Sequence, residues 1–185
     1  ETMLGDTAVA VHPDDERYKD IVGKKCILPI MNKEIPIIAD SFVEKEFGTG
    51  CVKITPAHDM NDYQAGIRNN LEIVEVFDDS SIMLDLVPEY KGMKAIEARK
   101  LIVEELEKIG ALVKTEDYTH NVGKCYRCHS TIEPRISEQW FVKMKDLAKV
   151  AADSVRNDEV KFVPKRYEKM YFNWLDNIQD WCISR

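Results

Sequence analysis

The sequence predicts a β-rich α+β fold with a barrel-like core, peripheral helices and a helical connector. Three observations predict it. Short β-prone runs separated by turn-rich pieces fill the first part of the chain, a long amphipathic helical pattern follows them, and two further helical patterns occupy the end. Short strands with turn signals at this spacing are typical of an antiparallel sheet or barrel. We therefore expect a core over residues 1–120, and a Cys-x-x-Cys turn with a helical connector over residues 121–185.

The β-prone runs are rich in valine and isoleucine and are bounded by glycine, proline, asparagine or aspartate, which favour turns. Pro56 ends the fourth run, because proline cannot donate a hydrogen bond to a sheet. The predicted strands are Ala8–Val11, Lys25–Leu28, Ile35–Ile38, Cys51–Thr55 and Leu71–Phe77.

Four helices are expected from apolar residues spaced three or four apart and from residues that favour helix ends. Asn61–Asn69 forms a short helix with Asn61 as its cap. Lys94–Ile109 is amphipathic and is followed by Gly110, a common helix stop. The last two helices are Val142–Val155 and Pro164–Ile178, the second with its proline near the start, where a missing N–H costs little.

Composition narrows the class of protein. With 185 residues, 44% of them hydrophobic and 32% charged, the chain is long enough for one main core and is not of the disordered type. The net charge of −7 argues against non-specific nucleic-acid binding as the main task. No apolar run approaches the ~20 residues that cross a bilayer, so we expect a cytoplasmic protein without a membrane partner.

Two further features concern the chain as a whole. The five cysteines are an odd number at irregular spacing, which does not indicate a secreted disulfide framework. Residue 1 is a glutamate rather than an initiator methionine, so we expect a piece of a longer protein.

The densest run of chemical groups follows a strand bounded by glycines. Gly48 and Gly50 permit the backbone to approach a ligand, and a Pro-Ala-His-Asp turn gathers polar side chains at one rim. Asp59 and Asp62, three residues apart, could together bind an ammonium group and a hydroxyl. The alternative is that these aspartates only cap the following helix.

Other residues near this turn also have two interpretations. His58 is the candidate general base by type, since its ordinary pKa lies near neutrality, but a histidine in a turn often only bonds the backbone. Strand alternation puts Lys53 on the same face as Cys51 and Thr55, where a lysine is usually solvated.

Cys125 and Cys128 are spaced as half of a zinc knuckle, a redox dithiol or, with His129 adjacent, a c-type haem attachment site. Haem would require export, and a redox pair would need a helix that the following residues do not favour. Zinc is the favoured group, with His120, His129 and Cys182 as candidates to complete four ligands. Two reduced cysteines in a connector are the structural alternative.

Three segments resemble the editing insertions of the class I aminoacyl-tRNA synthetases for valine, isoleucine and leucine. They are Glu1–Val11, the stretch from Phe47 through the Lys53–Asp62 loop, and Asp180–Arg185. The Thr-Thr-Arg-Pro that precedes the first segment in the family pattern is absent here. The loop is similar to that of valyl members, whereas isoleucyl members usually show a His-Gly pair, and Gln139–Val142 agrees with the valyl type.

The resemblance implies a role for each residue of the loop and its surroundings. Asp59 would hold the α-ammonium of the substrate, and Thr2 would position the ester or its attacking water. Asp62 would accept a hydrogen bond from the threonine hydroxyl. Lys53 and Phe47 would line the pocket around the aminoacyl-adenosine, and Thr55 and His58 complete the expected binding residues.

The activity implied is hydrolysis of threonine wrongly attached to tRNA(Val), with the aminoacylated 3′ end and the remaining synthetase domains as partners. Hydrolysis would need no cofactor. Zinc would be completed by cysteines beyond residue 185, and ATP would serve only the synthetic domain outside this chain. Alternatives are an isoleucyl editing domain, a tRNA-binding or structural piece without hydrolysis, and an independent zinc or redox protein.

Overall fold

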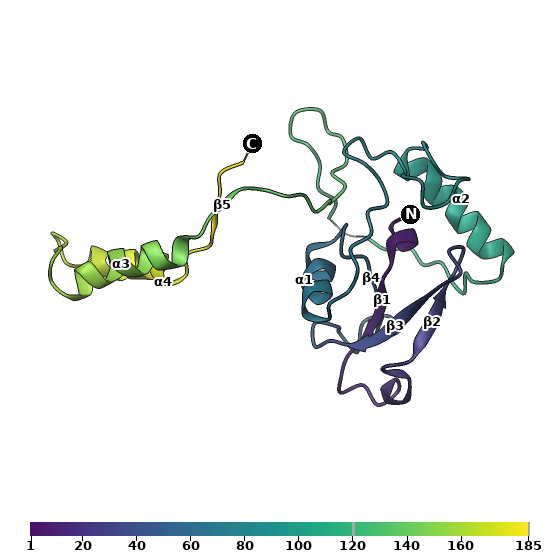
Figure 1. Ribbon diagram of the computed structural model, residues 1–185, viewed down its shortest axis with the longest axis horizontal. Helices are drawn as coiled ribbons and strands as arrows, with labels where there is room; N and C mark the ends of the chain where they lie inside the picture. Colours follow the sequence, from purple (N-terminus) through teal and green to yellow (C-terminus); the bar gives the residue numbers. More distant parts are fainter. Residues whose placement is uncertain (120, 185) are drawn as a thin grey trace. The chain divides into compact units, whose positions relative to one another are not determined.

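A computed structural model describes residues 1–119 and 121–184 (Figure 1). The chain divides into two compact units, Glu1–Ile136 and Ser137–Arg185. Each unit has its own secondary structure and is described by itself. No helix of the described residues is long and apolar enough to cross a membrane.

The first unit contains a four-stranded sheet in the order β2-β3-β1-β4. β1 is parallel to β3 and antiparallel to β4, and β2 and β3 form an antiparallel pair. The strands are β1 Ala8–Val11, β2 Lys25–Leu28, β3 Lys33–Ala39 and β4 Cys51–Ile54, which confirms four of the five predicted strands. The α+β class is as predicted, but within the described ranges the sheet is open and no closed barrel forms.

The fifth predicted strand is wrong. Residues 71–77 form no strand, and only an isolated bridge joins Phe77 to Met83. Val76 and Phe77 are almost completely buried, and the Val76 amide donates to His58 Nε2 instead of to a neighbouring strand. The run is therefore a loop that is buried at its end, where the Val76 amide finds its partner outside a ladder.

The helices of the first unit agree with the prediction more closely than the strands do. They are η1 Thr2–Gly5, η2 Lys19–Ile21, α1 Met60–Arg68 and α2 Ala95–Lys108. Gly110, with a φ of 71°, follows α2 as predicted. The predicted cap of α1 is wrong, because Asp59 rather than Asn61 is its N-cap.

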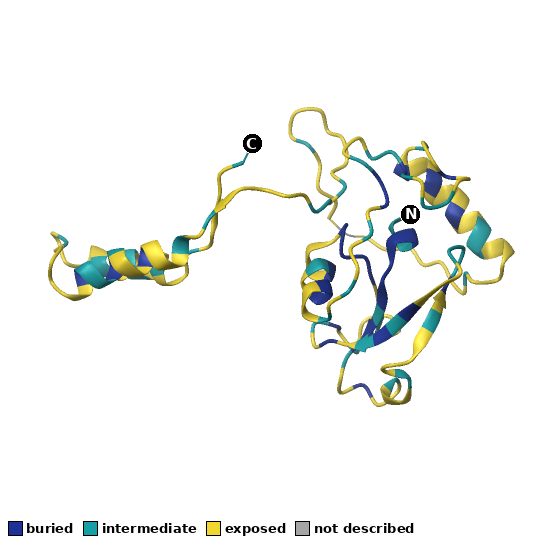
Figure 2. Cartoon of the chain, in the orientation of Figure 1, coloured by how far each residue is buried: buried dark blue, intermediate teal, exposed yellow. Residues whose placement is uncertain are grey.

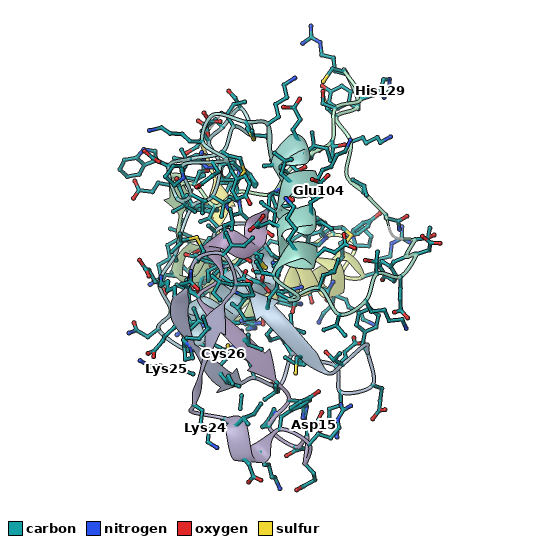
Figure 3. All side chains as sticks on the ribbon, turned by 90° about the vertical axis from the view of Figure 1, so that its right-hand side faces the viewer. Asp15, Lys24, Lys25, Cys26, Glu104 and His129 are labelled. Atoms are coloured by element: carbon teal, nitrogen blue, oxygen red, sulfur yellow. The ribbon has the colours of Figure 1, made fainter. Side chains whose placement is uncertain are left out.

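After α2 the chain runs through a long, mostly exposed stretch that includes the Cys-x-x-Cys turn. His129, at the end of this turn, lies near the top of the view in Figure 3, whereas Cys26 of β2 lies below the middle. Cys26 is therefore remote from the paired cysteines.

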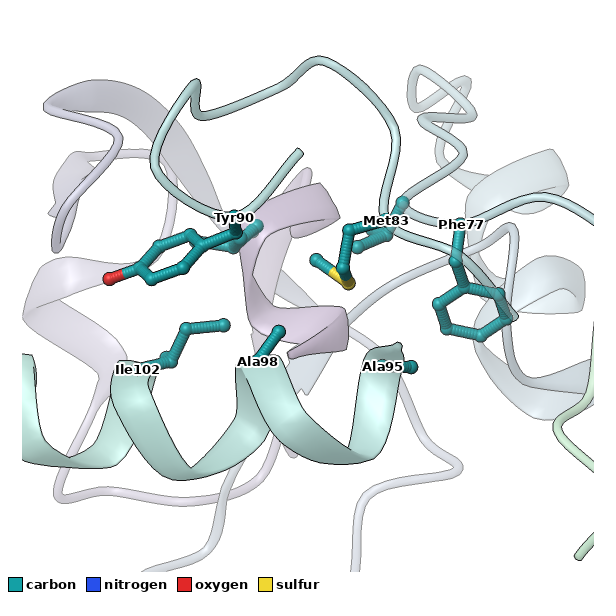
Figure 4. Packing of buried hydrophobic residues seen from close by; sticks show 8 residues of the cluster. Phe77, Met83, Tyr90, Ala95, Ala98 and Ile102 are labelled. Carbon is teal, nitrogen blue, oxygen red and sulfur yellow. The ribbon is translucent and has the colours of Figure 1, made fainter. Parts of the chain in front are cut away.

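The larger of two hydrophobic clusters in the first unit lies where α2 covers the loops around Tyr90 and Met83 (Figure 4), and the other joins β1 and β4. Buried positions concentrate on β1 and on one face each of α1 and α2 (Figure 2). Gly5 ends η1 directly against this core, where an added Cβ would lie 2.5 Å from Val76 Cγ2 and 2.8 Å from the Val74 carbonyl. Only glycine fits there, and this close approach fixes the short helix that carries Thr2.

The second unit consists of α3 Met144–Arg156 and α4 Tyr167–Asp176, with β5 Phe141–Val142 paired antiparallel to β6 Trp181–Cys182. Both predicted helices exist. The first begins later than predicted because Phe141 and Val142 pair with β6. The second begins at Tyr167, so Pro164 lies before the helix and not in its first turn.

Candidate functional site

A cavity of about 420 Å³ opens where β4 ends and α1 begins. The antiparallel register of β1 and β4, with Ala8 opposite Ile54, brings the residues that precede β1 alongside this end of β4. The cavity is lined by Thr2, Phe42, Val52, Lys53, Thr55, His58, Asp59, Asn61 and Asp62. Six of the seven residues predicted for the site thus border one space, and Phe47 is the exception.

Lys53 is the cation of the cavity. Its Nζ donates to Thr55 Oγ1 at 2.8 Å and to Thr2 Oγ1 at 3.2 Å. The bond to Thr55 confirms that the two side chains share a face, as strand alternation predicts. An ammonium group beside two hydroxyls can stabilise negative charge that develops on a bound substrate.

Asp59 both caps α1 and borders the cavity. Its Oδ1 accepts from the Asn61 amide at 2.7 Å and from the Asp62 amide at 3.1 Å. Its Oδ2 accepts no hydrogen bond from the described residues. The capping alternative is thus the observed geometry, and it leaves the second oxygen of an exposed carboxylate available to a cationic ligand.

Asp62 is the buried carboxylate of the pair, with 7% of its surface exposed. Its Oδ2 accepts from the Thr55 amide at 2.9 Å, whereas Oδ1 has no hydrogen-bond partner among the described residues. Burial raises the pKa of Asp62, and the hydrogen bond from Thr55 opposes this effect. Asp62 can therefore offer the cavity one acceptor oxygen in a partly desolvated position.

His58 has both ring nitrogens engaged by the backbone. Nε2 accepts from the Val76 amide at 2.9 Å, so Nδ1 carries the proton and donates to the Pro134 carbonyl at 3.1 Å. The ring is 5% exposed and lies 4.1 Å from the ring of Phe77, and burial lowers the pKa of His58. This is the backbone-bonding alternative, and in it no ring nitrogen is available to accept a proton from water.

The segment that contains Pro134 is held firmly against this loop. The Ile136 amide donates to the Ala57 carbonyl at 2.9 Å, and Arg135 pairs with Glu75 at 3.1 Å. The last residues of the first unit therefore hold the turn that carries Asp59 in place.

Phe47 lies beside the cavity rather than in it. Its ring is 62% exposed and meets Tyr118 edge-on, with 6.2 Å between ring centroids. The two rings border a neighbouring hollow of about 330 Å³, which shares Phe42 and Val52 with the cavity. A flat aromatic ligand portion could extend from one space to the other.

Asp6 is a residue of this region that the sequence did not predict. This residue is 3% exposed, accepts a hydrogen bond from Thr55 Oγ1 at 2.5 Å and lies 3.6 Å from Lys53 Nζ. Burial raises its pKa to about 6, although Lys53 and the Thr55 hydroxyl act in the opposite direction. The available signal was a lone carboxylate two residues before an apolar strand, where a charge needs a partner.

The Cys-x-x-Cys turn is a tight hairpin closed by a bridge between Lys124 and Thr131. Cys128 Sγ lies 3.2 Å from Ser130 Oγ, and this contact is the main cause of a Cys128 pKa lowered to about 7. The described residues contain no group of three or more His, Cys, Asp or Glu side chains that could hold a metal ion.

The described residues therefore do not support the prediction that nearby side chains supply the remaining zinc ligands. His129 is adjacent but makes no such group with the two cysteines, and Cys182 belongs to the second unit. His120 lies outside the described residues. Two thiols alone do not fit a tetrahedral zinc ion, so zinc binding by Cys125 and Cys128 stays a prediction.

Comparison with known proteins gives one consistent result. Residues 6–185 match the family model of class I tRNA synthetases (I, L, M and V). The chain is 60% identical to the valine–tRNA ligase of Carboxydothermus hydrogenoformans, 57% to that of Thermotoga maritima and 58% to that of Clostridium tetani. Each comparison covers the whole chain but only 21% of the relative, so the chain corresponds to about a fifth of these ligases. The chain belongs to the class I tRNA synthetase family and is similar to one region of its valine–tRNA ligases.

Proposed function

We propose that this chain is the editing region of a valine–tRNA ligase, and that it hydrolyses the ester of threonine wrongly attached to tRNA(Val). The observation that carries the proposal is the cavity itself. In a chain of this family, one space is lined by a cation, Lys53, and by two carboxylates with unpaired oxygens, Asp59 and Asp62. These groups are complementary to an aminoacyl ester that carries an ammonium and a hydroxyl.

Each end of the amino acid has a matching group. The exposed Oδ2 of Asp59 would pair with the α-ammonium, which every aminoacyl-tRNA carries. The partly desolvated Oδ1 of Asp62 would accept from the side-chain hydroxyl. Because the Thr55 amide already fixes the other oxygen of Asp62 at 2.9 Å, this acceptor is preorganised.

The reaction is hydrolysis by a positioned water. The water oxygen attacks the carbonyl carbon, the bond from that carbon to the ribose oxygen breaks, and a proton from the water passes to the departing ribose oxygen, which becomes a hydroxyl. The products are free threonine and tRNA. Lys53 would stabilise the charge that develops on the carbonyl oxygen, and Thr2, hydrogen-bonded to Lys53, would orient the ester or the water.

The need for a second site follows from the limits of an apolar pocket. Valyl enzymes are the standard example of these limits, because a pocket shaped for valine cannot strongly reject threonine, which replaces a methyl by a hydroxyl. A second, polar site would instead bind threonine in preference to valine. Valine would leave the buried oxygen of Asp62 without a partner, so the correct product would be spared.

The whole protein would attach valine to tRNA(Val) with ATP in a separate synthetic domain, and it would act in the cytoplasm. The partners of this region would be the aminoacylated 3′ end of the tRNA and the remaining domains. Phe47 and Tyr118 would contact the terminal base. Hydrolysis would need no cofactor, and zinc at Cys125 and Cys128 would require ligands from elsewhere in the longer protein.

The test is deacylation of pre-formed esters by the full-length protein. Threonyl-tRNA(Val) should be hydrolysed much faster than valyl-tRNA(Val), with the uncatalysed rate as a baseline. Hydrolysis of valyl-tRNA(Ile) in preference to threonyl-tRNA(Val) would support the isoleucyl alternative. Release of threonine at only the uncatalysed rate would contradict the proposal and favour a tRNA-binding or structural role.

A further inference from the structure

A carboxylate that the proposed reaction does not use lies directly behind the cavity. Asp6, between η1 and β1, is 3% exposed and is not among the residues that line the cavity. A buried ionised carboxylate is unfavourable unless it is paired and hydrogen-bonded. Both partners that meet this need are residues of the cavity wall.

These partners form one directed chain of hydrogen bonds. Lys53 Nζ donates to Thr55 Oγ1 at 2.8 Å, and the Thr55 hydroxyl donates to Asp6 Oδ1 at 2.5 Å. The same Asp6 oxygen also lies 3.6 Å from Lys53 Nζ. The cation is therefore tied to the buried charge both directly and through a hydroxyl.

This arrangement restricts a side chain that would otherwise be mobile. Nearly half of the Lys53 side chain, 48%, is exposed, and a free lysine of this kind samples many rotamers. The fixed charge of Asp6 on one side and the Thr2 hydroxyl on the other hold the ammonium at one point. A group held in place before substrate arrives stabilises developing charge more effectively than one that must be ordered.

We propose that Asp6 is a positioning residue for ester hydrolysis, which holds the Lys53 ammonium at the cavity directly and through the Thr55 hydroxyl. The inference rests on the proposed function. Asp6 itself touches neither the substrate nor the reacting atoms, so its whole effect on the reaction passes through Lys53 and Thr55.

Asp6→Asn in the full-length protein tests this role. Asparagine keeps the shape and can accept from Thr55, but it carries no charge for Lys53. The single-turnover rate of threonyl-tRNA(Val) deacylation should fall about tenfold or more, with the half-saturating tRNA concentration changed less than about twofold. Valine activation in the same protein should be unchanged. Asp15→Asn is the matched control, since Asp15 is also a buried ion-paired aspartate, with Arg17 at 2.6 Å, and its hydrogen-bond partners do not line the cavity.

A double-mutant cycle separates positioning from general damage to the fold. In a Lys53→Met background, Asp6→Asn should slow deacylation by less than about twofold, because the group that Asp6 holds is gone. An undiminished effect in that background would overturn the assignment, as would an Asp6→Asn protein that edits at the wild-type rate.

A second variant and the activity of the wild type complete the test. If Asp6→Asn does not fold, Thr55→Val removes the linking hydroxyl while it keeps the charge of Asp6 and nearly the same volume. It should show the same slowing and the same loss of effect in the Lys53→Met background. A wild-type protein without threonyl-tRNA deacylation would contradict the proposed function, whereas an active wild type with an unaffected Asp6→Asn variant would overturn only the role of Asp6.

Discussion

Lys53 donates a hydrogen bond to Thr2 at 3.2 Å, although the two residues are 51 positions apart in the sequence. The bond follows from the sheet, because β1 runs antiparallel to β4 and the residues before β1 pass the end of β4. The candidate site therefore depends on a strand pairing as well as on a loop. Single substitutions can separate the tasks of its residues.

Asp59→Asn should strongly slow threonyl-tRNA deacylation while it preserves α1. Asparagine still caps a helix, but it cannot pair with an ammonium as a charged group, a loss of about 1.5–3 kcal/mol or roughly 10- to 150-fold in rate. Asp59→Ala should lose the activity and also destabilise the helix by about 0.5–2 kcal/mol. Deacylation assays and amide hydrogen exchange over α1 measure the two effects separately, with valine activation as the control. Editing at the wild-type rate by Asp59→Asn would exclude the ammonium role.

Asp62→Ala should narrow the difference between threonyl- and valyl-tRNA hydrolysis rather than only remove activity. The wild-type carboxylate attracts the hydroxyl of threonine and is left without a partner by valine, a difference on the order of 1–3 kcal/mol, or about 5- to 150-fold in rate preference. Alanine removes both effects. Single-turnover deacylation of both esters by the full-length protein gives the ratio. If the ratio is unchanged, Asp62 does not recognise the hydroxyl.

The stability of the first unit should depend on pH through Asp6. Its pKa is raised by burial to about 6 in the folded protein, so the folded state binds a proton more tightly than the unfolded chain. This contribution to stability is complete below pH 4 and is lost as the pH rises through 6, by on the order of 2–3 kcal/mol. Lys53, Asp62, Cys26 and the α-amino group of Glu1 are neighbouring titratable groups.

Comparison of wild type with Asp6→Asn at each pH isolates this effect, since the other groups titrate in both proteins. Relative to wild type, the variant should gain stability between pH 4 and pH 7. Hydrogen exchange of the β1 amides, measured for both proteins side by side, reports the difference. A difference that does not vary with pH would show that Asp6 titrates normally.

His58→Ala should lower the stability of the first unit rather than remove a catalytic group. It leaves the buried Val76 amide and the Pro134 carbonyl without their partner, at a cost of about 1–3 kcal/mol. Faster hydrogen exchange over residues 71–77 and 133–136 should reveal the loss. His12→Ala is the control, because His12 makes one local bond to the Asp14 amide and its loss should change stability by about 0.5 kcal/mol or less. Unchanged exchange together with lost deacylation would instead restore His58 as the general base.

Zinc should bind at Cys125 and Cys128 only in the full-length protein. The isolated 185-residue chain should retain little zinc after dialysis, because two thiolates form a weak, open site. In the full-length protein, Cys125→Ser should release metal that Cys51→Ser retains, and elemental analysis gives both amounts. Stoichiometric zinc in the isolated chain would show that local residues complete the site.

Much of this structure follows from local sequence patterns. Alternation predicted that Lys53 and Thr55 share a face, and Gly110 marked the end of α2, because both features depend on neighbouring residues only. Asp59 and Asp62 were expected together at one rim, and both border the cavity.

Failures of prediction came where tertiary contacts decide the outcome. Val76 and Phe77 have a strand-like composition, but the Val76 amide donates to a side chain and Phe77 makes only an isolated bridge, while both side chains fill the core. Asp6 was missed because its partners, Lys53 and Thr55, are nearly 50 positions away, and no local pattern reveals them. The open sheet likewise follows from strand order, which short alternating runs do not specify.

The bond between His58 and Pro134 also sets an order of events in folding, because it joins residues 76 positions apart. A contact of this span closes a large loop, and its entropic cost falls on the folding of the first unit as a whole. During synthesis on the ribosome, the turn that carries Asp59 emerges long before the residues that fix it from behind. The turn can acquire its final hydrogen bonds only after Pro134 and Ile136 have emerged, so the site is among the last parts of the first unit to be completed.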